Sequence, residues 1–399
     1  MERKRILARD GPVRWPAFLR DVLVCSLGAY GGPETHMSVF LDQLVSKRNY
    51  LRESELIELI ALCSILPGPT STQTIVAVGY RTGGPGLAFL TMLVWALPVL
   101  TAMAALSFLY QFLAVRDIPF EVLRFIGPMA VGFIIVAAVR IGRKVVVDAQ
   151  TAILMLFGGA VTYLVRAPWI FPVVLVIGGL VSIGIGREPG MWNPVRVRPP
   201  WVYLAMFVSL ALAGIVLAGL LDVRLVRLFE SFYRYGYLVF GGGQVVVPVM
   251  HSELVDVRRY MTNQEFLTGY GLVQGLPGPM FSFAAYAGGM AARGTTTVAQ
   301  VAGAVIGGVG IFLPGLLLIY FVYPLWEDLK RIRAVRISLK GINAVAGGLI
   351  AVAAVILMQA SGLALENAVV TAVAAGLLGF TKVPAPLIVA GALIAGFVV

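Results

Sequence analysis

Two copies of the tetrapeptide Leu-Pro-Gly-Pro are the residues of this chain best suited to chemistry. They occupy positions 66–69 and 276–279, 210 positions apart, and each lies within a long apolar run. Proline removes a backbone donor and glycine relaxes the chain, so Pro-Gly-Pro ends one helix and lets another begin. The new helix begins with free N–H groups and the positive end of its dipole, which bind anions without any lysine or arginine. The sequence therefore predicts two half-helix starts that bind an anion.

The residues around each break offer short hydrogen-bond donors beside an apolar wall. The candidate binding residues at the first break are Pro67, Gly68, Pro69, Thr70, Ser71, Thr72 and Gln73. Those at the second break are Pro277, Gly278, Pro279, Met280, Phe281 and Ser282. An alternative stays open, in which each Pro-Gly-Pro only kinks a packed helix.

The composition places these breaks inside a membrane. Of 399 residues, 59% are hydrophobic and 13% are charged, whereas soluble proteins carry about 25% charged residues. The apolar blocks are long enough to cross a hydrocarbon layer of about 30 Å. We therefore expect an all-α polytopic membrane protein, because a β-barrel would show short alternating segments instead. The net charge of +11 fits basic cytoplasmic loops rather than a surface for nucleic acid.

The apolar segments form two sets of six with one segment between them. The first set lies at about 17–33, 55–80, 85–113, 121–140, 149–165 and 169–186, and the connecting segment at 201–221. The second set lies at about 229–250, 265–292, 297–325, 340–359, 366–380 and 383–399. We predict a first repeat over 1–186, a linker with one transmembrane helix over 187–228, and a second repeat over 229–399.

The two sets are related by duplication. When residue 30 is placed over residue 240, thirteen of the next forty positions are identical, including the whole Leu-Pro-Gly-Pro. Glycine pairs also interrupt equivalent apolar segments, in "GAYGGPETH" (28–36) and "LVFGGGQVV" (238–246). Internal duplication in a membrane protein is typical of transporters, whose binding sites lie at broken helices near the bilayer midplane.

Loop charges predict that the two repeats have opposite orientations. The loop after 113 is nearly balanced, whereas its counterpart after 325 is rich in lysine and arginine. The next loop, "RIGRK", is basic, and its counterpart "MQASGLALEN" has no base. Short basic loops stay in the cytoplasm. The connecting segment 201–221 would therefore invert the second repeat and point the two half-helix starts toward each other.

Few ionisable residues accompany the breaks. Arg81, after the first half-helix, is either an anion-steering charge or ligand, or an anchor at the membrane edge. Glu34 and His36 follow the first glycine break and are candidates for coupling transport to a second ion, although His36 also fits a satisfied core histidine. Glu55 and Glu265 precede the broken helices, where helix capping is the simpler interpretation.

The motifs "GGPETH", "ALCSILPGPTSTQTIVAVGYRTGGPG", "FGGGQVVVP" and "GYGLVQGLPGPMFSFAAYAGG" resemble the chromate ion transporter family in its long, two-repeat form. The resemblance covers roughly residues 17–140 and 229–359. It implies export of chromate, a tetrahedral dianion, across the cytoplasmic membrane and resistance to chromate. The expected partners are a chromate-like or sulfate-like oxyanion and the lipid bilayer, with a second copy of the chain as a further candidate.

Other functions remain as alternatives. The chain can be a carrier or a passive channel for sulfate or another oxyanion. A membrane-bound reductase needs a redox centre, and the sequence offers Cys25 and Cys63 without metal-ligand spacing, no dinucleotide turn, and only two histidines. No phosphate-binding P-loop is present. We therefore expect a secondary transporter without enzymatic activity, cofactor or metal.

Overall fold

The computed structural model describes a helical protein with several membrane-crossing helices. The described residues are 13–31, 33–115, 121–165, 167, 169–186, 198–238, 246–294, 296–329, 332–362 and 364–398, and they contain no strand. The helices long and apolar enough to cross a membrane are Thr70–Leu113, Glu121–Val145, Trp201–Leu220, Thr297–Leu325 and Arg336–Ser361. The chain is an all-α polytopic membrane protein, as its composition predicts.

The helices follow the expected order along the chain. In the first half they are α1 (Trp15–Gly28), α2 (Pro33–Phe40), the π-helical turn η1 (Leu41–Lys47), α3 (Glu53–Ile65), α4 (Thr70–Val115), η2 (Glu121–Leu123), α5 (Ile126–Val145), α6 (Ala149–Val165) and α7 (Ile170–Ile185). The connecting helix is α8 (Trp201–Leu220). In the second half they are α9 (Arg224–Leu238), α10 (Val246–His251), the π-helical turn η4 (Ser252–Val257), α11 (Asn263–Val273), η5 (Met280–Ser282), α12 (Phe283–Ala292), α13 (Thr297–Val322), η6 (Tyr323–Leu325), α14 (Trp326–Leu329), α15 (Arg333–Ser361), α16 (Leu365–Phe380) and α17 (Ala385–Val398).

The first Pro-Gly-Pro break reverses the chain, which corrects the prediction of one broken span over 55–80. Arg81 Nη2 lies 2.6 Å from Glu55 Oε1, although 26 positions separate them. Two helices in line would hold these residues about 39 Å apart. α3 and the first part of α4 are therefore antiparallel arms of a hairpin whose tip is the break. Local sequence predicts where the helix stops, but packing decides the direction in which the chain continues.

A second reversal divides α4 into two parts. Gly83 and Gly84 have non-helical backbone angles within it. The indole Nε1 of Trp95 donates to Thr72 Oγ1 at 3.1 Å across 23 positions, a separation of about 35 Å in a straight helix. Residues 70–82 thus form a short half-helix that packs against the long helix 85–115.

The second half repeats this hairpin. Arg293 Nη1 lies 2.6 Å from Glu265 Oε1, which joins the end of α12 to the start of α11. α12 then packs closely on α13, where a Cβ added at Gly288 would lie 2.2 Å from the Gly303 carbonyl oxygen. Glycine thus allows the half-helix and the following long helix to touch through their backbones.

Backbone angles show the duplication independently of residue identity. Gly68 and Gly278, in the two breaks, have φ of +125° and +103°. Asn49 and Arg259 both have φ of +53°, which is rare for residues other than glycine, and each follows a π-helical turn. These pairs are 210 positions apart, so the repeats share local conformation where their side chains differ.

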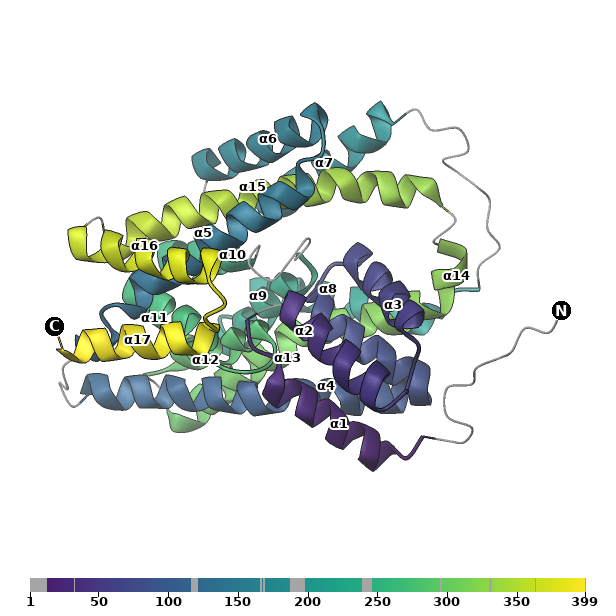
Figure 1. Ribbon diagram of the computed structural model, residues 1–399, viewed down its shortest axis with the longest axis horizontal. Coiled ribbons are helices and arrows are strands. Elements are labelled where there is room, and N and C mark those ends of the chain that lie inside the picture. Colours follow the sequence, from purple (N-terminus) through teal and green to yellow (C-terminus); the bar gives the residue numbers. More distant parts are fainter. Residues whose placement is uncertain are drawn as a thin grey trace.

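The two halves pack against each other rather than as separate bodies. α6 and α7 pack on α15, α16 packs on α5, and α5 and α15 contact each other. Figure 1 shows α1, α2 and α3 toward the right of the view and α11 and α12 toward the left. This placement agrees with hairpins that enter from opposite sides of the membrane.

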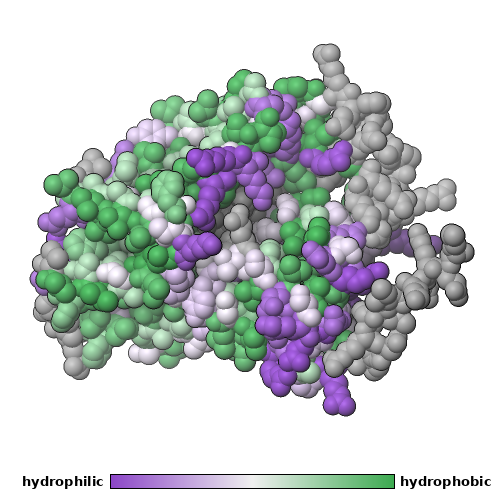
Figure 2. Space-filling model, in the orientation of Figure 1, coloured by the Kyte–Doolittle hydropathy of each residue, from purple (hydrophilic) through white to green (hydrophobic). Residues whose placement is uncertain are grey.

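The surface fits a protein embedded in lipid. α8 contacts α9 and α13 and is otherwise exposed, including Trp201, Leu212 and Leu220. Figure 2 shows apolar side chains over much of the left half, and hydrophilic ones around α1 at the lower right and across the upper middle of the view. The second glycine interruption, 239–245, lies outside the described residues.

Topology provides the first prediction. Because a hairpin returns to its own side, 55–80 does not cross. Asp21 of α1 also accepts a hydrogen bond from Gln43 of η1, so α1, α2 and η1 form another hairpin in the first half. With these two hairpins the first half keeps four of its six predicted crossings, which is still an even number. α8 would then invert the second half. In otherwise unchanged protein, single cysteines at Asp117 and Gly362 should react with a membrane-impermeant thiol reagent from outside, whereas those at Asn193 and Arg333 should not.

The native cysteines do not confuse this experiment, because Cys25 and Cys63 are both fully buried. Labelling of positions 117 and 333 from the same side would rule out the inverted arrangement.

Candidate functional site

The first break ends in a half-helix start covered by its own glutamine. Gly68 has a positive φ that favours glycine. Gln73 folds back over it, and its Nε2 donates to the Pro67 carbonyl at 2.8 Å. The first N–H groups of a helix have no acceptor within it. The break therefore leaves the backbone donors of Thr70, Ser71 and Thr72 directed toward the hairpin tip.

Two aromatic rings hold the hydroxyl groups of this half-helix start. His36 Nδ1, from α2, lies 3.0 Å from Ser71 Oγ, and the Trp95 indole donates to Thr72 Oγ1. The rings of His36 and Trp95 meet edge to face, with centroids 5.4 Å apart. Because an indole only donates, the Thr72 hydroxyl proton stays available for another acceptor.

The second break contacts the end of α1, close to the first half-helix start. The Gly278 N–H donates to the Ala29 carbonyl at 2.7 Å, and that carbonyl also faces the His36 imidazole. A Cβ added at Gly278 would lie 3.2 Å from Val99 and 3.4 Å from Ser26 Oγ. Ala29 thus connects the break of the second repeat to the histidine beside the first half-helix start.

Each break packs against a proline-containing helix of the other repeat. Gly278 contacts Val99, which follows Pro98 in α4. In the first repeat, Pro69 and Gln73 lie against Gly315, which follows Pro314 in α13. This reciprocal contact brings both breaks to the interface between the repeats.

Unpaired polar atoms lie at both half-helix starts. His36 Nε2, Gln73 Oε1 and Ser282 Oγ are buried and have no hydrogen-bond partner among the described residues. These three residues are 2%, 1% and 0% exposed. A buried unpaired polar group costs about 1–3 kcal/mol. Their presence here favours a site whose hydrogen bonds are completed by a ligand.

Arg81 does not join the half-helix start. It lies about 16 Å along the helix from Thr70 and pairs with Glu55. The equivalent pair, Arg293 and Glu265, is closed by a second contact from Arg293 Nη2 at 2.8 Å. Each arginine therefore closes the open end of a hairpin.

Glu55 and Glu265 also cap the helices that they begin, as the sequence predicts. Glu55 accepts the Arg52 N–H at 2.7 Å, and Glu265 accepts the Thr262 N–H at 2.8 Å. The side chain of Glu34 lies outside the described residues. In the described part of the chain, no group of histidine, cysteine and acidic residues could hold a metal ion.

The polar side chains at the site come mainly from the first repeat. His36 corresponds to Val246, Ser71 to Phe281, and Gln73 to Phe283, all at an offset of 210. Trp95 corresponds to Ile311 in the matched pair "WALPVL" and "IFLPGL". Sequence reasoning did not identify Trp95 or the Ala29 carbonyl. The sequence signal that could have identified Trp95 as a site residue is its difference from Ile311 at the matched position of the duplicated motif.

Comparisons with known proteins show similarity to membrane transporters over both halves of the chain. The sequence profile of the family described as "Chromate transporter" matches residues 17–183 and 226–397. The chain is similar to a "Chromate transport protein" from Pseudomonas aeruginosa, with 28% identity over 94% of both chains. It is 26% identical to a "Probable chromate transport protein" from Synechococcus elongatus over 93% of both. It is 25% identical to a "Chromate transport protein" from Cupriavidus metallidurans, covering 92% of this chain and 89% of that one. No solved structure matches the chain.

The backbone at the breaks generates one prediction. Alanine at Gly68 would be strained at φ +125° and would bring its Cβ within 2.7 Å of Gln73 Nε2. We expect Gly68→Ala to lower the free energy of unfolding by about 1–3 kcal/mol, measured by thermal or denaturant unfolding in detergent. Gly184→Ala is the matched control, because nothing lies within 4 Å of a Cβ there. Equal stability of the two variants would contradict the strained-turn interpretation.

The hairpin ion pairs generate another prediction. Arg81 and Glu55 are 35% and 15% exposed, so solvent screening is only partial. Arg81→Gln and Arg293→Gln should each lower the free energy of unfolding by about 1 kcal/mol. Lys47→Gln should change it less, because Lys47 and Asp42 are both 59% exposed. A larger effect from Lys47→Gln would show that the two arginines do not close the hairpins.

Proposed function

The chain belongs to the chromate transporter family, and on this premise we propose that it is a secondary transporter that exports chromate across the cytoplasmic membrane and so confers resistance to chromate. The observation that carries the proposal is the meeting of the two Pro-Gly-Pro breaks at Ala29 and His36. A tetrahedral oxyanion held there would receive donors from both half-helix starts.

The chemistry of the site supports an anion rather than a cation. Backbone N–H groups and the positive ends of two half-helices face the hairpin tips, and these favour negative charge. Ser71, Thr72 and Ser282 add short hydroxyl donors, while Phe281 and Met280 supply an apolar wall. Arg81, the cation that the sequence offered after the first half-helix, is paired with Glu55. An anion bound without a full opposite charge can also be released, which transport requires.

Inverted repeats support alternating access. If the two hairpin pairs enter from opposite sides, rocking one repeat against the other would expose the shared tip first to one side and then to the other. His36 is our candidate for coupling to protons, because its imidazole sits between Ala29 and Ser71 and retains one unpaired nitrogen. Glu34 belongs to the same coupling proposal through its position in α2.

The decisive measurement is oxyanion uptake into inverted membrane vesicles, with and without a pH gradient. Chromate should accumulate against its gradient, and sulfate is added in excess as the competitor. His36→Gln should abolish the response to the pH gradient, because glutamine cannot exchange a proton. Downhill flux alone would favour the channel alternative. Equal uptake of sulfate would favour a general oxyanion carrier.

The half-helix starts generate the prediction on affinity. A charge-assisted hydrogen bond is worth about 1.5–3 kcal/mol, so Ser71→Ala and Ser282→Ala should each raise the half-saturating chromate concentration by about ten- to a hundredfold. Thr101→Ala is the control, because the exposed Thr101 hydroxyl donates only to its own helix at Leu97. If both serine variants transport with unchanged half-saturation, the shared oxyanion site is wrong.

A further inference from the structure

Each repeat has a buried carboxylate ahead of its Pro-Gly-Pro hairpin. In the first repeat it joins α1 to η1, and in the second repeat it joins α9 to η4. Asp21, in α1, is 1% exposed, and Glu253, in η4, is 3% exposed. Burial of a carboxylate in an apolar protein is costly unless charge and hydrogen bonds compensate it. Both carboxylates are fully engaged, so each holds several elements together.

Asp21 joins three parts of the first repeat. Its Oδ1 accepts from Gln43 Nε2 at 3.1 Å and from Arg48 Nε at 3.1 Å, and its Oδ2 accepts from Tyr50 at 2.7 Å. These partners lie in η1 and in the turn that follows it. Asp21 therefore fastens α1 to the returning arm of the hairpin α1–α2–η1.

Glu253 makes the corresponding connection in the second repeat. It accepts from Ser231 Oγ at 2.9 Å and from Arg234 Nη2 at 2.9 Å. Arg258, the equivalent of Arg48, approaches it at 3.9 Å. Arg234 is also bound by Glu230, at 2.6 Å, which keeps this cluster balanced in charge.

The two carboxylates do not occupy equivalent sequence positions. At an offset of 210, Asp21 corresponds to Ser231 and Gln43 corresponds to Glu253. The same pair of facing positions thus carries Asp and Gln in the first repeat, and Ser and Glu in the second. The carboxylate is therefore on the first helix of the contact in one repeat and on the π-helical turn in the other. The arginine after the π-helical turn, Arg48 or Arg258, is present in both repeats.

The location of this contact connects it to the oxyanion site. Asp21 precedes Ala29 by about 12 Å of helix, and Gln43 follows His36 by about 10 Å. Ala29 and His36 are the groups that meet Gly278 and Ser71. A change in the angle between the hairpin arms at Asp21 and Gln43 would move these two groups apart at the tip.

We propose that Asp21 with Gln43, and Ser231 with Glu253, form one positioning clamp in which a single buried carboxylate is required but either side can supply it. The proposal rests on the proposed function, because the clamp of the first repeat sets the geometry of the same oxyanion site. The tip of the second hairpin lies outside the described residues, so the test is made on the first repeat.

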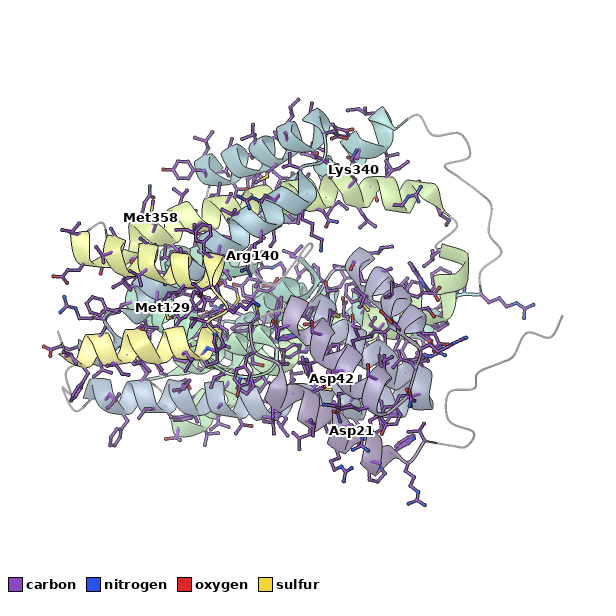
Figure 3. All side chains as sticks on the ribbon, viewed as in Figure 1. Asp21, Asp42, Met129, Arg140, Lys340 and Met358 are labelled. Carbon is purple, nitrogen blue, oxygen red and sulfur yellow. The ribbon has the colours of Figure 1, made fainter. Side chains whose placement is uncertain are left out.

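The test exchanges the first clamp for the arrangement of the second. Asp21→Asn removes the charge and should raise the half-saturating oxyanion concentration by about ten- to a hundredfold through misplacement of the tip. The double variant Asp21→Ser with Gln43→Glu places one carboxylate opposite a serine, as in Ser231 and Glu253. Its cation is Arg48, because the counterpart of Arg234 is Val24. The double variant should recover most of the wild-type affinity. Asp42→Asn is the control, because Asp42 lies on the same hairpin (Figure 3) but is 59% exposed in its pair with Lys47.

A second readout does not depend on transport. Cys25 lies between Asp21 and Ala29 in α1 and is fully buried. In a Cys63→Ser background, Asp21→Asn should increase labelling of Cys25 by a small thiol reagent, and the double variant should suppress it again. If the wild-type protein transported no oxyanion, the proposed function would be wrong. Labelling of Cys25 would still test the clamp in that case.

Two results would overturn the clamp. One is a folded double variant that is as impaired and as reactive at Cys25 as Asp21→Asn, because the carboxylate would then be needed at one position only. The other is an Asp21→Asn variant with normal half-saturation and protected Cys25, because the charge would then position nothing.

Discussion

A chain that leaves the helical conformation inside a membrane must find partners for the backbone groups that it exposes, and this constraint organises the whole structure. Each Pro-Gly-Pro break exposes backbone N–H groups at a depth where lipid offers them no hydrogen-bond partner. The protein therefore buries each break against the other repeat, at Val99 in one case and at Gly315 in the other. Of the exposed N–H groups, that of Gly278 is satisfied by the Ala29 carbonyl, and those at the half-helix starts face the interface between the repeats. The protection of the broken backbone and the proposed central anion site would both follow from one arrangement.

The duplicated backbone supports a site whose side chains are not duplicated. Both repeats have the same hairpin, with a glycine of positive φ at the tip and an arginine–glutamate pair at the open end. At the tip, however, the counterparts of His36, Ser71 and Gln73 in the second repeat are apolar. A symmetric scaffold fixes the geometry, and one repeat supplies most of the polar chemistry. In the proposed transporter, this division would let the second repeat move relative to the ion without losing many specific contacts.

Four carboxylates among the described residues lie at the open ends of hairpins. Asp21, Glu55, Glu253 and Glu265 are each paired with arginine at hairpin openings. Positioned there, ion pairs hold the arms together without placing a fixed charge beside the proposed anion site. A cation at the tip would bind the anion tightly, and tight binding would slow its release.

The sequence by itself determined the membrane class, the duplication, the positions of both breaks and the capping roles of Glu55 and Glu265, because these depend on composition and on residues only a few positions apart. Only the tertiary structure decided that 55–80 folds back on itself, since the direction after a flexible glycine depends on what the next helix packs against. It also decided that Arg81 pairs with Glu55, and that Trp95 and the Ala29 carbonyl belong to the site. Those contacts join residues 23 or more positions apart, and the close packing of helices, rather than local preference, selects them.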